Sequence, residues 1–106
     1  MNTGNSIEIP ALFTYRNRKL QIRYNIQSVE VPEENGTTAT RYNYDYVEVP
    51  PPVTRKAVID AIVRNRYDVN DEFALVSLPP TDPEYITYRK HVDQAKAIAD
   101  EVLSVL

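Results

Sequence analysis

The side chains that could do chemistry in this sequence are few, and their spacing matches no common catalytic motif. Among 106 residues there is one histidine, His91, and there is no cysteine. Without cysteine, a thiol nucleophile, a disulfide scaffold and a cysteine-ligated zinc or iron–sulfur centre are excluded. The two glycines are too few for the glycine-rich loops that bind phosphate groups.

His91 is the first candidate for a general base or a metal ligand. Lys90 lies beside it and Asp93 two residues further on, and no second histidine is present to share a metal ion. A helical histidine among charged neighbours is usually solvated on a polar face. We therefore expect His91 to be solvated.

The helical half of the chain contains four carboxylates that could supply an acid–base pair: Asp60, Glu84, Asp100 and Glu101. Nothing in their spacing brings any two of them together. Residues 68–72 resemble the start of a calcium-binding loop, but the sixth position is Phe73 instead of glycine and the twelfth is Pro79 instead of glutamate. We therefore predict no catalytic residue, no metal ligand and no cofactor, and a protein that is not an enzyme.

The charges of the chain argue against binding to duplex nucleic acid. The formal net charge is -3, and both signs are spread over the two halves of the sequence, so the electrostatic driving force is missing. One basic cluster is formed by Arg16, Arg18, Lys19 and Arg23. It could contact phosphate or an acidic partner. Exposed charges at a hairpin turn also block edge-to-edge association of strands, and we favour that interpretation.

Two unlike parts follow each other along the chain. Residues 7–49 show the composition and period-two alternation of strands, and residues 54–106 show helical patterns. A proline-rich connector, residues 50–53, separates them. Strands followed by helices predict an α+β fold, in a single domain covering residues 1–106. We expect a three-stranded antiparallel meander in order 1-2-3, with two longer helices and one short helix packed on one face.

The first hairpin of the meander has a clear register. With Asn17 and Arg18 as a two-residue turn, Tyr15 lies opposite Leu20 and Phe13 opposite Ile22. The same register places Ile9 opposite Ile26. Because every one of these pairs is apolar, one face of this hairpin is predicted to be buried and the other wet.

The second hairpin is predicted to project as an arm. With Asn35-Gly36 as the turn, Val29 lies opposite Tyr42 and Val31 opposite Thr40. The apolar residues of both strands change face at the same level, so the distal half buries the opposite side from the proximal half. A bulge in each strand would instead restore one face; we favour the change of face. The first strand is too short to cover the distal half, and a two-stranded ribbon is marginal alone.

The predicted interface is the apolar and aromatic stripe of this distal half, which consists of Val29, Val31, Tyr42, Tyr44 and Tyr46. Tyrosine is enriched at protein interfaces because it is large and keeps a polar tip. An aromatic stripe facing away from the helices needs a cover, which a partner or a second copy would provide. Cross-strand packing and base stacking of single-stranded nucleic acid are the alternatives.

Helix boundaries follow from capping residues. Thr54 is the predicted N-cap of the first helix, Asp68 or Asn70 caps a short helix over residues 71–77, and Thr81 or Asp82 caps the last. The last helix carries a heptad-like apolar seam, which packs on the sheet or, alternatively, against a partner helix. The predicted core consists of Phe13, Ile22, Tyr24, Val47, Val49, Val58, Ile62, Phe73, Val92 and Ile98.

Three segments carry a resemblance to known proteins: RYNYDYVEV at 41–49, RKAVIDAIVRNRYDVNDEFALV at 55–76 and YITYRKHVDQAKAIADEVL at 85–103. They resemble small uncharacterised proteins of gut Bacteroides genomes, some of them encoded in phage or prophage regions. The resemblance covers residues 20–106, and RNRYDVNDEFAL is its most specific piece. It implies a virion-associated or assembly protein, for example of the tail, and it carries over no catalytic residues.

From the sequence we expect a non-enzymatic structural or interaction module that forms a homo-oligomer through its tyrosine-rich hairpin face. The alternative is a small regulatory protein that binds a host or phage enzyme as an inhibitor or adaptor, and a single-stranded nucleic acid binder is a third possibility. The first ten residues lack a signal-peptide pattern, and no apolar run approaches about 18 residues. These features predict a cytoplasmic location, or the virion for a phage protein, and no contact with a membrane.

Overall fold

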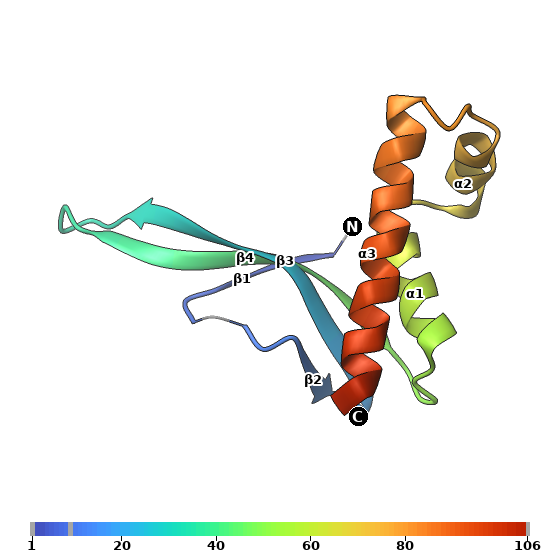
Figure 1. Ribbon diagram of the computed structural model, residues 1–106. Helices are drawn as coiled ribbons and strands as arrows, with labels where there is room; N and C mark the ends of the chain where they lie inside the picture. Colours follow the sequence, from blue (N-terminus) through green and yellow to red (C-terminus); the bar gives the residue numbers. More distant parts are fainter. Residues whose placement is uncertain (1, 9, 106) are drawn as a thin grey trace.

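The computed structural model describes residues 2–8 and 10–105, which form a four-stranded antiparallel sheet and three helices (Figure 1). The strands are β1 (Thr3–Ser6), β2 (Phe13–Arg16), β3 (Lys19–Pro32) and β4 (Thr38–Val49). The helices are α1 (Arg55–Arg64), α2 (Val69–Val76) and α3 (Pro83–Val105). The predicted α+β class is confirmed.

The sheet has one strand more than the sequence predicted. Its order is β1-β4-β3-β2, so the expected meander corresponds to β2, β3 and β4, and β1 adds to the outer edge of β4. The prediction missed β1 because its sequence, Thr-Gly-Asn-Ser, lacks the apolar and aromatic alternation that marks a strand. β1 is held by pairing with β4, with Gly4 opposite Tyr44.

The turn between β2 and β3 is the predicted one. Asn17 and Arg18 have φ angles of 51° and 63°, which are the left-handed conformations that a type I′ turn requires at both central positions. The apolar pairs of this hairpin are confirmed, with Phe13 opposite Ile22. The predicted pair that includes Ile9 lies outside the described residues.

The loop between β3 and β4 is longer than predicted. It spans residues 33–37, and the Glu33 N–H donates to the Thr37 carbonyl at 2.8 Å. Gly36 has a φ of 83°, and the Asn35 side chain accepts from the Thr37 N–H at 3.1 Å. A five-residue loop therefore replaces the two-residue turn and shifts the distal pairing by one residue.

A bulge in β3 divides the long hairpin into two halves. Asn25 and Ile26 together oppose a single residue of β4, Tyr44. Asn25 has a φ of 52°, a left-handed conformation that asparagine tolerates better than most residues. β4 has no matching bulge. Both predicted alternatives, a change of face in both strands and a bulge in each strand, are therefore wrong.

The core lies between the proximal half of the hairpin and the helices. Ile22 of β3 and Val58 and Ile62 of α1 are fully buried, and α3 lies across this end of the sheet (Figure 1). Thr54 caps α1 as predicted, accepting from the Ala57 N–H at 3.1 Å. The predicted core residues that are buried are Ile22, Tyr24, Val47, Val49, Val58, Ile62, Val92 and Ile98, and Phe13 packs half-buried against them.

Phe73 is the predicted core residue that is wrong. Its side chain is 71% exposed, whereas Leu75 is buried. Two residues apart on a helix point about 200° apart, so α2 can bury only one of them. α2 also begins earlier than predicted, because Asp68 and Asp71 form a capping box at its start. The same capping box explains the resemblance to a calcium loop.

Candidate functional site

The distal half of the β3–β4 hairpin, residues 27–43, forms an arm that stands away from the helices (Figure 1). The molecule measures 53 × 34 × 21 Å along its principal axes, and the arm makes it elongated. β1 accompanies β4 only as far as Tyr42, and β2 accompanies β3 only as far as Ile22. Beyond these points, neither edge of the arm has a neighbouring strand in the described chain.

Val29 and Val31, two of the predicted interface residues, lie on the helix side of the sheet. They pair with Arg41 and Ala39, and directly opposed residues of antiparallel strands share a face. The bulge at Asn25 shifts the alternation of β3 by one residue, which returns these valines to the side of the core. Val31 is 40% exposed and Val29 is half-buried.

The three predicted interface tyrosines, Tyr42, Tyr44 and Tyr46, lie on the reverse side, so the predicted shared face is wrong. β4 has no bulge, and these tyrosines alternate with the buried Val47. All three are half-buried. Because β1 and β2 lie on opposite edges of the sheet, the described residues between them, 7–8 and 10–12, have to cross one of its sides.

Contacts of Tyr44 show that this crossing is on the tyrosine side. A Cβ at Gly4 would collide with the Tyr44 ring, so the ring lies directly over β1 and needs glycine there. The Arg23 guanidinium lies 5.8 Å from the ring centroid, and its Nη1 donates to the Ala11 carbonyl at 3.1 Å. The Tyr46 ring lies 6.3 Å from that of Tyr44. These tyrosines therefore support the base of the arm.

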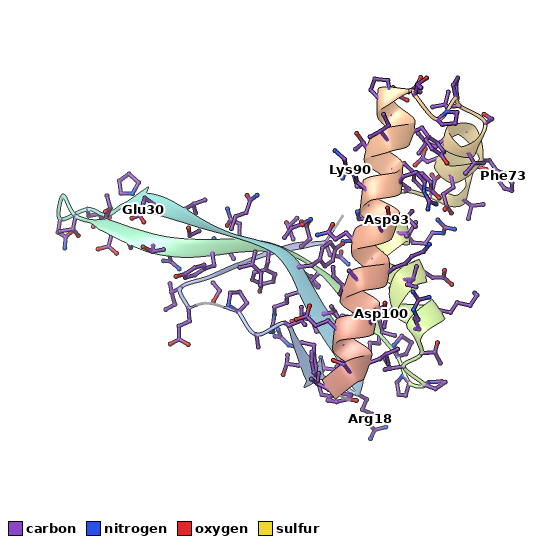
Figure 2. All side chains as sticks on the ribbon, in the orientation of Figure 1. Arg18, Glu30, Phe73, Lys90, Asp93 and Asp100 are labelled. Atoms are coloured by element: carbon purple, nitrogen blue, oxygen red, sulfur yellow. The ribbon has the colours of Figure 1, made fainter. Side chains whose placement is uncertain are left out.

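The predicted basic cluster divides into two parts. Arg23 is held by the tyrosine side, whereas Arg16, Arg18 and Lys19 are exposed at the β2–β3 turn. Figure 2 shows Arg18 pointing away from the molecule at the end of the sheet remote from the arm. Within residues 2–8 and 10–105, these three cations make no ion pair. Together with Tyr15, which is 65% exposed, they form what we call the basic turn.

Side-chain hydrogen bonds fix the base of the arm to the helices. Asn25 at the bulge donates to Asp45 Oδ2 at 2.9 Å, and Gln94 of α3 donates to Asn25 Oδ1 at 2.6 Å. Asn65, at the end of α1, donates to the Tyr24 hydroxyl at 2.7 Å. Burial raises the pKa of Tyr24. The arm therefore leaves the body at a joint of defined geometry.

His91 is buried, with only 4% of its surface exposed, so the prediction that it is solvated is wrong. Its Nε2 lies 3.0 Å from the Ile62 carbonyl of α1, and its ring meets that of Tyr67 edge-on at 5.6 Å. Burial lowers the pKa of His91, and the hydrogen bond to Ile62 opposes this shift only in part. Lys90 and Asp93, labelled in Figure 2, are exposed as expected. Position 91 instead belongs to the buried stripe of α3.

A second cluster with shifted pKa values clamps α2 to the other helices. The Tyr88 hydroxyl donates to Glu72 Oε2, and Arg64 Nη2 lies 2.5 Å from Glu72 Oε1. Burial and the Glu72 partner raise the pKa of Tyr88 to about 12. The hydrogen bond from Tyr88 is the main cause that lowers the pKa of Glu72. Structural ion-pair clusters shift pKa values as catalytic sites do, and the partnered groups here join three helices.

The candidate carboxylates are not brought together as a pair. Asp60 pairs with Lys56 at 2.9 Å and Asp100 with Arg55 at 2.7 Å. In the part of the chain that the structure describes, no three side chains of the metal-binding types gather into a possible site. The described helices include none with the length and apolar character needed to cross a membrane.

The sequence did not predict a second apolar surface, which lies on α2. Val69, Phe73 and Val76 are 50%, 71% and 57% exposed, and their spacing of four and three residues places them on one helix face. Figure 2 shows Phe73 pointing away from α3, on the side opposite to the arm. Apolar spacing alone could not identify this face as exposed, because the same spacing marks a buried face.

No known family model, curated protein or solved structure matches this chain. What the protein does is therefore inferred from the arm, the basic turn and the exposed face of α2.

Proposed function

We propose that this protein is a non-enzymatic interaction module that associates with copies of itself through the arm. The supporting observation is that the hairpin continues past the last pairings with β1 (at Tyr42) and with β2 (at Ile22) and stands away from the helices. A two-stranded ribbon is marginally stable in water, and open strand edges favour pairing with another chain. Val29 and Val31, on the helix side of the arm, are the proposed contact residues. Tyr42 lies on the reverse side, where Tyr44 and Tyr46 support the base of the arm.

Residues 20–106 resemble small proteins of Bacteroides genomes, some of them encoded in phage or prophage regions, and this resemblance adds a context to the proposal. A virion, or the machinery that assembles it, is built from repeated subunits that use the same contact in every copy. An arm that reaches from one subunit to the next would suit this role. The proposed location is then the cytoplasm during assembly, or the virion itself.

Light scattering across a concentration series tests the proposed self-association. The mass of the wild-type chain is expected to rise above 12.2 kDa as the concentration increases. Replacing Val29 and Val31 with Thr removes apolar contact but keeps β-branching, and should return the mass to that of the monomer. The matched control carries Val69→Thr and Val76→Thr on α2 and should associate like the wild type. A wild-type monomer at every concentration, or an equal loss in the control, would refute the proposal.

A second candidate function is a regulatory adaptor or inhibitor that binds a host or phage enzyme. The observation that favours it is the exposed apolar face of α2, because an adaptor needs a second surface separate from the arm. This function predicts a monomer in isolation and a stoichiometric complex with a defined enzyme. Binding to single-stranded nucleic acid would instead appear as a salt-sensitive shift of a labelled oligonucleotide.

A further inference from the structure

We infer that the arm of one copy docks on the basic turn of the next copy, so that the copies associate head to tail. This inference rests on the proposed function and names the surface that receives the arm. The observation that supports it is that the arm and the basic turn are both exposed, lie at opposite ends of β3 and have opposite charge.

The arm has an acidic outer part. Between residues 27 and 43 it carries one cation, Arg41, and three carboxylates, Glu30, Glu33 and Glu34. The Thr40 hydroxyl donates to Glu30 at 3.0 Å, which orients this carboxylate without neutralising it. As far as the structure describes the chain, the three carboxylates make no ion pair. Glu30 lies opposite Thr40 on the reverse side of the sheet, whereas the exposed Val31 lies opposite Ala39 on the helix side. Glu33 and Glu34 follow in the exposed loop at the tip, so the outer part of the arm is acidic on the reverse side and at its tip and apolar at Val31.

The basic turn complements this surface in charge and in apolar character. Arg16, Arg18 and Lys19 are exposed, and the sequence has no carboxylate between Glu8 and Glu30. Tyr15 is 65% exposed and pairs with Leu20, so it lies on the other face of the hairpin from Arg16 and Lys19, where it can pack against an aliphatic side chain. A partner for this turn should therefore be acidic and should offer an exposed apolar side chain, and the outer part of the arm has both.

The two surfaces cannot meet within one chain. They lie at the two ends of β3, which has 14 residues and therefore spans roughly 45 Å at about 3.3 Å per residue. This separation is several times the Debye length of about 8 Å at physiological salt. Each charge is therefore free to attract the complementary surface of another copy. When two copies associate in this way, the turn of one copy and the arm of the other stay unoccupied. Further copies can bind there, so the assembly grows into a ring or a filament.

The sheet edge beside the basic turn would let the arm add as a further strand. β2 is an edge strand of the sheet, and in the described chain no other strand pairs with its outer edge. Beyond Tyr42, where the pairing with β1 ends, neither edge of the arm has a strand neighbour among the described residues. Strand addition would supply backbone hydrogen bonds, and the opposite charges would select the partner and the register. Isolated surface ion pairs contribute little to binding, so the inferred contact needs both the backbone hydrogen bonds and the opposite charges.

Charge reversal on each surface tests this contact. One variant carries Glu30→Lys, Glu33→Lys and Glu34→Lys, and the other carries Arg16→Glu, Arg18→Asp and Lys19→Glu. Aspartate is chosen at position 18 because it tolerates positive φ. In light scattering, each variant alone is expected to bind itself at least about tenfold more weakly than the wild type. An equimolar mixture should recover association, because each reversed surface then meets an opposite charge.

The mixture separates this inference from the proposed function. Recovery by mixing supports the head-to-tail contact. If the wild type associates but the mixture remains monomeric, the head-to-tail contact is overturned while arm-mediated association stands. A wild type that stays monomeric overturns both. Wild-type association should also weaken when NaCl rises from about 50 mM to about 500 mM, and salt-independent association would contradict the inference without any variant.

Discussion

The two halves of the β3–β4 hairpin are built from the same two strands, yet only one half is covered. In the proximal half, Ile22 lies opposite Val47, and both are buried against the helices. In the distal half, Val31 lies opposite Ala39 and is 40% exposed. Because β-branched residues occur in both halves, strand preference alone does not distinguish them. What distinguishes them is the cover supplied by α1 and α3, which makes the proximal half stable without a partner.

Truncation of one side chain in each half should show the largest difference. Ile22→Ala leaves a cavity in the core and is expected to lower the free energy of unfolding by about 2–5 kcal/mol. Val31→Ala alters only an exposed surface of the monomer, so it should change the free energy of unfolding by less than about 0.5 kcal/mol. Urea unfolding followed by circular dichroism, in dilute protein, measures both. Equal losses would mean that the arm contributes to the monomer core.

Substitutions of Asn25, at the bulge between the two halves of the hairpin, should change stability according to how well the new residue tolerates positive φ. Asn25→Ala places a residue that disfavours positive φ in the left-handed region and removes the hydrogen bonds to Asp45 and Gln94. We expect a loss of about 1–2 kcal/mol. Asn25→Gly removes the same hydrogen bonds but suits this φ, so it should cost less. Thermal unfolding compares the two variants, and an Ala variant as stable as the wild type would contradict the role of the bulge.

The contact of β1 with Tyr44 should be sensitive to a single methyl group. Gly4→Ala collides with the tyrosine ring, so β1 is expected to separate from β4 at a cost of about 1 kcal/mol. Hydrogen exchange should then accelerate at Ser6, which lies in a hydrogen-bonded pair with Tyr42, while the core amides keep their protection. Thr3→Ala, next to Gly4, is the control and should leave exchange unchanged. Full protection of β1 in the Gly4 variant would show that the ring can move aside.

The pH dependence of stability should report the burial of His91 and is the smallest expected effect. Its pKa is lowered in the folded chain, below the ordinary value of 6.5, so the unfolded chain binds the proton first as the pH falls. The stabilising effect is therefore complete above about pH 6.5 and is lost as the pH falls through the lower folded pKa. His91→Gln should flatten this part of the curve. Urea unfolding between about pH 7 and pH 5 measures it, and an identical slope in the variant would contradict the prediction.

The sequence predicted the features that depend on local patterns. The Asn17-Arg18 turn, the Thr54 cap and the apolar seam of α3 each follow from a few neighbouring residues. β1 could not be predicted, because its strand conformation comes from pairing with β4. The predictions that His91 is solvated and Phe73 is buried were wrong. The pattern of a helix shows which residues share a face, but it does not show how far the neighbouring elements extend to cover that face.

The candidate site was harder to predict, because a shift of one residue reverses which side of a sheet a residue faces. The loop at residues 33–37 shifted the pairing, and the single bulge at Asn25 returned Val29 and Val31 to the helix side. Only the three-dimensional pairing could show that the tyrosines face the other way. The prediction that the hairpin projects was unaffected, because it depended on strand length rather than on register.

Hydrogen exchange of the arm at two protein concentrations tests the proposed self-association most directly. In dilute protein, amides of residues 28–31 and 39–41 should exchange rapidly, while the amides of Ile22 and Val47 are protected. At high concentration the arm should gain at least about tenfold protection as a second copy covers it, and the core amides should not change. Arm amides that exchange equally fast at both concentrations would contradict association through the arm.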